Sequence, residues 1–238
     1  AIYYHCNDLY FAFPYLKEKL DDEERKCIIH YFNLSILYEI LDLLNILNMV
    51  KGFDLGQNTI INIQELIRLY IHAYEFPPLG TDIIRHLMTI VLREKGEARN
   101  WFEDRQEIKP NFLPMDFINK FCEILQDKNP WIKSRAIYFQ LDDYSTPNIS
   151  NQLQETINDF IFFPSEGAEC FFKISTESII TFHPNNSKDK LLEEGREFVV
   201  VDLGYLFLSN EPQASKFVIE VINNRLKNSE QIDKSYAN

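Results

Sequence analysis

Glycine is scarce in this chain, with seven residues among 238. A loop that cradles phosphate groups needs glycines where its backbone approaches the phosphates, and neither GxxxxGK[ST] nor GxGxxG occurs in the sequence. Collagen-like and low-complexity chains are excluded as well, because they are rich in glycine and proline. The sequence therefore predicts a folded protein without a nucleotide-binding loop, and we expect no cofactor.

Cysteine is also rare, and the four cysteines are widely separated: Cys6, Cys27, Cys122 and Cys170. No two of them form a CxxC pair, so neither a zinc site nor a disulfide framework is indicated. We interpret them as reduced, mostly buried thiols of a cytoplasmic protein. The N-terminal residues lack a basic start followed by an apolar run, so we expect no signal peptide.

Basic residues are outnumbered, with 24 Lys and Arg against 36 Asp and Glu, which gives a formal net charge of −12. A general nucleic-acid binder needs a basic face that displaces counterions from phosphates, so this class is excluded. The hydrophobic fraction of 45% and the aromatic fraction of 14% are too high for a disordered chain. An acidic protein with a large core remains.

The longest apolar stretch, residues 28–50, contains acidic residues in its interior. Glu39 and Asp42 near its middle would each cost about 2.5–3.5 kcal/mol at the centre of a bilayer, so we expect no membrane span. The acids of residues 21–24 suit the first turn of a helix, where the helix dipole favours negative charge. These features predict a central buried helix at about 22–49 within a helical bundle.

The fold class predicted from periodicity is α+β. Further helices are expected in the N-terminal half at about 63–74, 81–96 and 114–125. The C-terminal half is expected to hold a strand at 136–141, a helix at 150–161, antiparallel hairpins at 170–183 and 197–209, and a terminal helix at 212–226. We therefore divide the chain into a helical region, 1–129, and an α+β region, 130–238, which could also form one continuous domain.

A long window of the second half, between Arg135 and Lys173, contains no Lys or Arg. It is rich in acids and aromatic rings, and acids around aromatic anchors suit the capture of a basic protein. The candidate partner-binding residues are Asp142, Asp143, Tyr144, Glu155, Asp159, Glu166 and Glu169. In the competing interpretation the rings belong to the core and the carboxylates are ordinary solvated positions.

The adjacent acids Asp142 and Asp143 come at the end of the predicted strand. A carboxylate pair in this position can bind Mg²⁺ or Ca²⁺ through oxygen. The spacing fixes no third carboxylate beside them, so we interpret the pair as part of a turn and predict no metal site.

Arg25 and His30 are the sharpest catalytic candidates. Their spacing resembles the Arg-x(4–6)-His signature of HEPN-type ribonucleases, although Lys26 follows the arginine where that family prefers Asn, Asp or His. The resemblance implies a helical, usually dimeric ribonuclease in which the two side chains act on the scissile phosphate and the 2′-hydroxyl.

The leading hypothesis is a non-enzymatic acidic binding protein of the cytoplasm. It would be an immunity-type inhibitor that neutralises a basic toxin or nuclease through protein–protein contacts, without binding nucleic acid or a membrane. Two alternatives stay open. The first is the HEPN-like ribonuclease, and the second is a structural or assembly subunit that packs its long apolar helix against another copy.

Overall fold

The computed structural model describes most of the first 202 residues. The described ranges are 1–16, 19–71, 83–105, 109–133, 135–145, 149–162 and 168–202, together with the single positions 205, 212, 215, 216, 219, 220 and 223. The chain divides into two compact units, Ala1–Glu193 and Glu194–Asn238.

The first unit contains a three-stranded parallel sheet with the strand order β1-β2-β3. The strands are β1 (Ile2–His5), β2 (Ile137–Asp142) and β3 (Cys170–Ile174). The pairing places Ile2 opposite Phe139 and Ile137 opposite Cys170. Each connection between neighbouring strands is a helical crossover, as parallel pairing requires.

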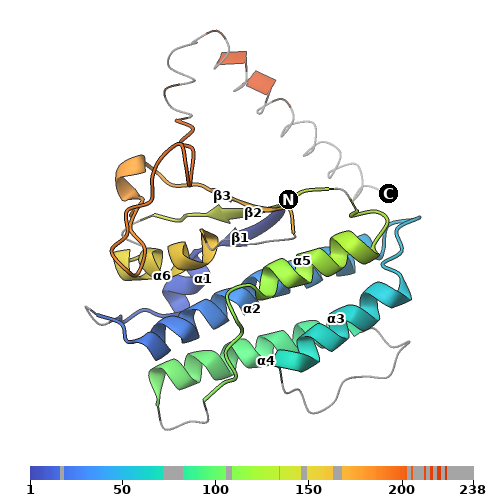
Figure 1. Cartoon of the computed structure of the whole chain (residues 1–238). Helices are drawn as coiled ribbons and strands as arrows, with labels where there is room; N and C mark the ends of the chain where they lie inside the picture. Colours follow the sequence, from blue (N-terminus) through green and yellow to red (C-terminus); the bar gives the residue numbers. More distant parts are fainter. Residues whose placement is uncertain are drawn as a thin grey trace, which may run out of the picture. The chain divides into compact units, whose positions relative to one another are not determined.

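Six α-helices are described, with a short 3₁₀ helix η1 (Ile179–Thr181). They are α1 (Asn7–Ala12), α2 (Asp22–Leu47), α3 (Gln57–Tyr70), α4 (Ile83–Glu103), α5 (Phe117–Lys128) and α6 (Asn151–Ile161). Figure 1 shows α2 below the sheet, and α1 and α6 lie on this same side of the sheet. Helices α3 and α4 form a further layer on the far side of α2. The first unit is therefore a layered mixture of helices and strands.

The predicted central helix is confirmed as α2. The Asp21 carboxylate accepts hydrogen bonds from the Glu23 and Glu24 backbone N–H groups, and the Glu24 carboxylate accepts one from the Asp21 N–H. This capping box explains why the helix begins where it does. The predicted helix at 150–161 is confirmed as α6, which begins where the Ser150 hydroxyl accepts a hydrogen bond from the Leu153 N–H.

Helix α2 lies at the centre of the core. Its Phe32 ring contacts Tyr4 of β1 and Phe160 of α6, with centroid separations of 5.5 and 5.1 Å. The helix is long and apolar enough to cross a membrane, but 78% of its most apolar window is buried inside the protein. This burial fits the core helix of a soluble protein.

The predicted antiparallel hairpin at 170–183 is wrong, whereas the turn and most of the second strand of the hairpin predicted at 197–209 lie outside the described residues. The segment 170–174 pairs in parallel with β2 because α6 returns the chain to the same end of the sheet, and residues 179–181 form η1 instead of a partner strand. Helix α4 also continues past Gly96 to Glu103, since one glycine inside a helix costs only about 1 kcal/mol. The predicted terminal helix, 212–226, falls mostly outside the described residues.

Strand β1 was not expected, and it changes the relation between the two predicted regions. It comes from the region 1–129 but pairs with β2 of the region 130–238. Residues 1–193 accordingly form one body with a shared sheet.

One ionic network ties the start of the chain to α2 and α4. The Asp8 carboxylate accepts hydrogen bonds from the hydroxyls of Tyr4, Tyr31 and Ser35, each at 3.1 Å, and lies 2.8 Å from the Lys95 ammonium. Burial raises the pKa of Asp8, but the Lys95 charge and the donated hydrogen bonds outweigh it, so the pKa lies below its ordinary value.

We expect Asp8→Asn to lower the free energy of unfolding by about 2–3 kcal/mol at pH 7, below the 3–5 kcal/mol of fully buried pairs because Asp8 keeps partial exposure. Because the pKa of Asp8 is lower in the folded chain than in the unfolded chain, this stabilisation is fully present above the pKa of an unfolded carboxyl group, about 4. It is lost as the pH falls through the pKa that Asp8 has in the folded chain. Urea unfolding of both proteins from pH 7 to pH 3 measures the difference.

The matched control is Asp116→Asn, which removes an acid that pairs with Lys120 on the surface of α5. Its cost should stay below about 1 kcal/mol, as for other exposed ion pairs. Equal losses for the two variants, or a difference that does not shrink in acid, would contradict the role given to Asp8.

Candidate metal site at the carboxyl edge of the sheet

The carboxyl ends of the three parallel strands meet at one edge of the sheet. His5 ends β1 and pairs in register with Asp142, which ends β2, while Ser175 directly follows β3. Open parallel sheets bind ligands at this edge, because the loops that follow the strands gather there. This edge is therefore the position in the fold where a functional site is expected.

Asp142 is held by two hydroxyl groups. The Ser175 Oγ donates a hydrogen bond to its Oδ1, and the Tyr3 hydroxyl donates one to its Oδ2. These two hydrogen bonds, that of Ser175 foremost, hold the pKa of Asp142 below its ordinary value. The same contact raises the pKa of Tyr3 to about 12. Asp142 is accordingly a fixed carboxylate at neutral pH.

Asp143 has a left-handed backbone, with φ of 57°. Residues with side chains adopt this conformation at a cost, which Asp and Asn tolerate better than most. The Asn7 side-chain amide donates a hydrogen bond to Asp143 Oδ2 at 3.2 Å, which joins the end of β2 to the residues after β1. Such backbone strain is commonly found at functional sites.

His5 completes the cluster. Its Nδ1 lies 3.7 Å from Asp142 Oδ2 and 4.0 Å from Asp143 Oδ2, and the three donor atoms lie within 4.8 Å of one another. The side chains of His5, Asp142 and Asp143 are 62%, 27% and 48% exposed, so water and ions reach all three.

The donor set fits a divalent cation. Two ligands of an Mg²⁺ ion at about 2.1 Å lie about 3.0 Å apart when adjacent and about 4.2 Å apart when opposite, so small side-chain rotations would suffice. Carboxylate oxygens suit Mg²⁺ and Mn²⁺, and an imidazole favours Mn²⁺ over Mg²⁺. The earlier interpretation of Asp142 and Asp143 as a simple turn lacked His5, which was missed because β1 was not predicted.

The sequence held one signal for this strand, because Ile2, Tyr3 and Tyr4 are β-branched or aromatic residues of the kind enriched in strands. In the structure their exposure alternates between buried and exposed, as in a strand with one face on the core. Predicting this short strand would have placed His5 at a strand end. Its proximity to Asp142, 137 residues later, depends on pairing that local sequence does not reveal.

Tyr144, a predicted partner-binding residue, is fully buried. Its hydroxyl donates toward the Gln154 carbonyl and the Asn158 side-chain oxygen, each at 3.0 Å. Phe139 and Phe160 of the same window are also buried. These rings act as core residues, as the competing interpretation held.

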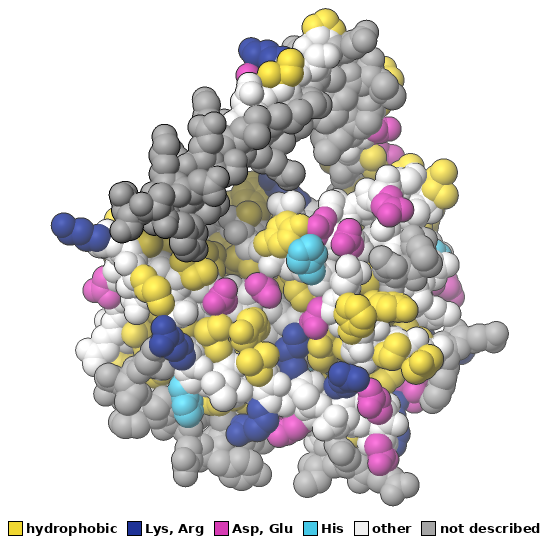
Figure 2. All heavy atoms as spheres, turned by 180° about the vertical axis from the view of Figure 1, so that it is seen from behind, with side chains coloured by type: hydrophobic (Ala, Val, Ile, Leu, Met, Phe, Trp, Pro, Cys, Tyr) yellow, Lys and Arg dark blue, Asp and Glu magenta, His cyan; other side chains and the backbone are white. Residues whose placement is uncertain are grey.

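The other predicted partner-binding acids lie apart from the cluster. Glu155 and Asp159 belong to α6, where Glu155 pairs with His183 at 2.9 Å. Glu169 is exposed before β3, and Glu166 lies outside the described residues. On the face shown in Figure 2, acidic side chains form small groups separated by apolar and basic ones.

The structure does not bring Arg25 and His30 together at a surface. His30 is completely buried, its Nδ1 accepts a hydrogen bond from the Leu113 N–H at 3.1 Å, and burial lowers its pKa to about 3. Arg25 lies in the first turn of α2, 3.8 Å from Asp22. A neutral imidazole in the core has no access to an RNA substrate.

The fold mixes helices and strands, which is consistent with the predicted α+β class, and its parallel sheet carries an acid pair at the carboxyl end of its middle strand. A family model described as ORC-CDC6-like matches residues 1–236, so the chain belongs to the ORC-CDC6-like family. Comparison with curated proteins and with solved structures found no match.

We expect glycine to be better tolerated than alanine at position 143. Asp143→Gly and Asp143→Ala both remove the carboxylate, but only glycine adopts positive φ freely, so the Gly variant should be more stable by about 1 kcal/mol. Urea unfolding of the two variants measures this difference.

The control position is Glu123 on the exposed side of α5. There the order should reverse, with alanine more stable than glycine by about 1 kcal/mol, because alanine favours a helix. The same order at both positions would show that the backbone of Asp143 is not in the left-handed region.

Proposed function

We propose that this chain contributes the divalent-cation site of a nucleoside-triphosphate-dependent reaction, with Asp142 and Asp143 as the cation ligands. The ORC-CDC6-like family is related to the AAA+ ATPases. The observation that carries the proposal is the cluster of His5, Asp142 and Asp143 at the carboxyl edge of a parallel sheet.

The place of the acids in the fold supports this proposal. In P-loop NTPases an Asp at a strand end holds the Mg²⁺ that bridges the β- and γ-phosphates. Asp142 ends the middle strand of the described sheet, and its orientation is fixed by Tyr3 and Ser175. An ionised, preoriented carboxylate binds a cation without a further ordering cost.

The proposed chemistry is electrostatic. A bound Mg²⁺ supplies charge that neutralises phosphate oxygens and orients the leaving group. Asp142 and Asp143 would hold this ion by one oxygen each, because Mg²⁺ in nucleotide sites keeps several waters and takes only one or two carboxylates. His5 would contact a metal-bound water or a phosphate oxygen at the exposed rim.

The binding of a basic protein and the immunity-type inhibition of a toxin stay predictions, as does the cytoplasmic location. The two binding hypotheses rest on the net charge of −12 and on the acidic window between Arg135 and Lys173, and the location rests on the unpaired cysteines. The burial of Tyr144 removes one of the candidate contact residues. The pair of Asp142 and Asp143 at the end of β2 supports the cation site more directly.

No GxxxxGK[ST] loop occurs in the 238 residues, so the test measures cation binding and not nucleotide hydrolysis. Titration with Mn²⁺, followed by electron paramagnetic resonance of the free ion, should show one saturable site. Asp142→Asn and Asp143→Asn should each weaken Mn²⁺ binding at least about tenfold, since each removes a charged ligand.

The matched control is Asp127→Asn, another acid-to-amide change, on an exposed carboxylate of α5 that is not part of the cluster. It should leave Mn²⁺ affinity unchanged. If Asp127→Asn weakened binding as much as the strand-end variants do, Mn²⁺ would be held by the overall negative charge, and the proposed site would be refuted.

A further inference from the structure

We infer that a cavity at the opposite end of the sheet binds a small organic carboxylate with an apolar tail. The cavity has a volume of about 280 Å³ and is bounded by the start of β1, the start of β2, the last turns of α2 and the segment between α5 and β2. It lies at the amino ends of β1 and β2, whereas the cation cluster lies at their carboxyl ends.

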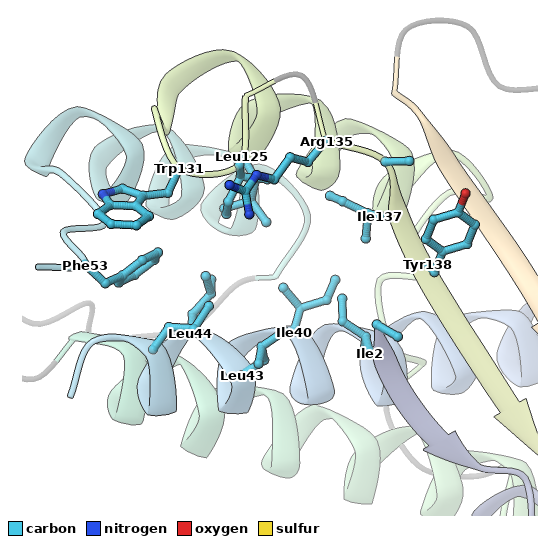
Figure 3. A pocket seen from close by; sticks show the side chains of 14 residues that line it. Ile2, Ile40, Leu43, Leu44, Phe53, Leu125, Trp131, Arg135, Ile137 and Tyr138 are labelled. Carbon is cyan, nitrogen blue, oxygen red and sulfur yellow. The ribbon is translucent and has the colours of Figure 1, made fainter. Parts of the chain in front are cut away.

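The walls of the cavity are apolar. Figure 3 shows Ile40, Leu43 and Leu44 of α2 on one side, with Leu125 and Arg135 facing them. The rings of Phe53 and Trp131 close one end, with centroids 6.2 Å apart. Small-molecule sites are typically apolar clefts with a few polar groups that orient the ligand.

The charged side chain at this cavity is that of Arg135, an exposed residue. Arg135 carries the only charged side chain among the fourteen lining residues. Among the described residues, no acidic side chain forms an ion pair with this guanidinium. A guanidinium beside an apolar cavity is complementary to a carboxylate, which it binds through two parallel hydrogen bonds.

The volume limits the size of the ligand. At about 30 Å³ per non-hydrogen atom, close to the volume of a water molecule in the liquid, the cavity holds about nine atoms. This is near the lower limit of about 300 Å³ for drug-sized ligands. A straight-chain carboxylate such as octanoate, with its head group at Arg135 and its tail along α2, matches this volume.

The full chain offers a direct readout of binding. Trp131 is half exposed at the end of the cavity, whereas Trp101 is buried and pairs with Arg105 elsewhere. Octanoate in the cavity should therefore change the fluorescence of Trp131. The protein is titrated with octanoate and with 1-octanol, and calorimetry checks the result. The comparison separates the contribution of the carboxylate to the binding affinity from that of the apolar tail.

We expect octanoate to bind about tenfold more tightly than 1-octanol, and Arg135→Gln to abolish this difference without weakening the binding of 1-octanol. Lys133→Gln is the matched control, since it removes an exposed cation two residues away that does not line the cavity. It should leave both affinities unchanged. Ala136→Leu, which narrows the cavity, should weaken both ligands.

Three outcomes would overturn the inference. The first is no binding of octanoate at millimolar concentration, and the second is equal affinity for octanoate and 1-octanol. The third is an equal effect of Arg135→Gln and Lys133→Gln, which would show attraction by general positive charge. Circular dichroism of each variant shows that the fold is retained, and Mn²⁺ binding at Asp142 reports independently on the other end of the sheet.

Discussion

The packing of the sheet onto α2 is the constraint on which the rest of the first unit depends. The Phe32 ring of α2 packs edge-on against the Tyr4 ring of β1. The Phe139 ring of β2 stacks on the Phe172 ring of β3, with their centroids 5.1 Å apart. A shift of one residue in any strand would turn these rings to solvent, so their burial sets the register. The register in turn places His5 opposite Asp142. The geometry of the candidate cation site is therefore determined by hydrophobic contacts outside it.

In the candidate site, neutral hydroxyl groups orient a charged carboxylate. Asp142 receives hydrogen bonds from Tyr3 and Ser175, which belong to or follow the two neighbouring strands. Asp143 is turned toward Asn7 by its left-handed backbone. Each carboxylate is thus positioned by residues from other segments of the chain, so its orientation is a property of the assembled sheet.

The elements that follow from the sequence are those that local interactions determine. The capping box at Asp21 and the serine cap at Ser150 mark the starts of α2 and α6, because a cap acts within three residues of itself. The strand before Asp142 was predicted from its β-branched and aromatic residues. These features need no knowledge of the remaining chain.

The elements that were mispredicted are those that segments distant in the chain determine. The parallel direction of β3 depends on the path of α6 across the sheet, and the position of His5 depends on a partner 137 residues away. Tyr144 was predicted at a surface, but Gln154 and Asn158 satisfy its hydroxyl inside the protein. Composition alone does not distinguish a buried, hydrogen-bonded tyrosine from an exposed one.

The buried imidazole of His30 links unfolding to the uptake of a proton. Its pKa of about 3 in the folded chain lies far below the ordinary value of 6.5, because the core excludes the charged form. The unfolded chain therefore binds one proton more than the folded chain between these two pH values. Over that interval, acidification by one pH unit costs the folded state about 1.4 kcal/mol at this single residue. Mild acid therefore lowers the free energy of unfolding through this one imidazole, beginning at pH values where most carboxylates are still ionised.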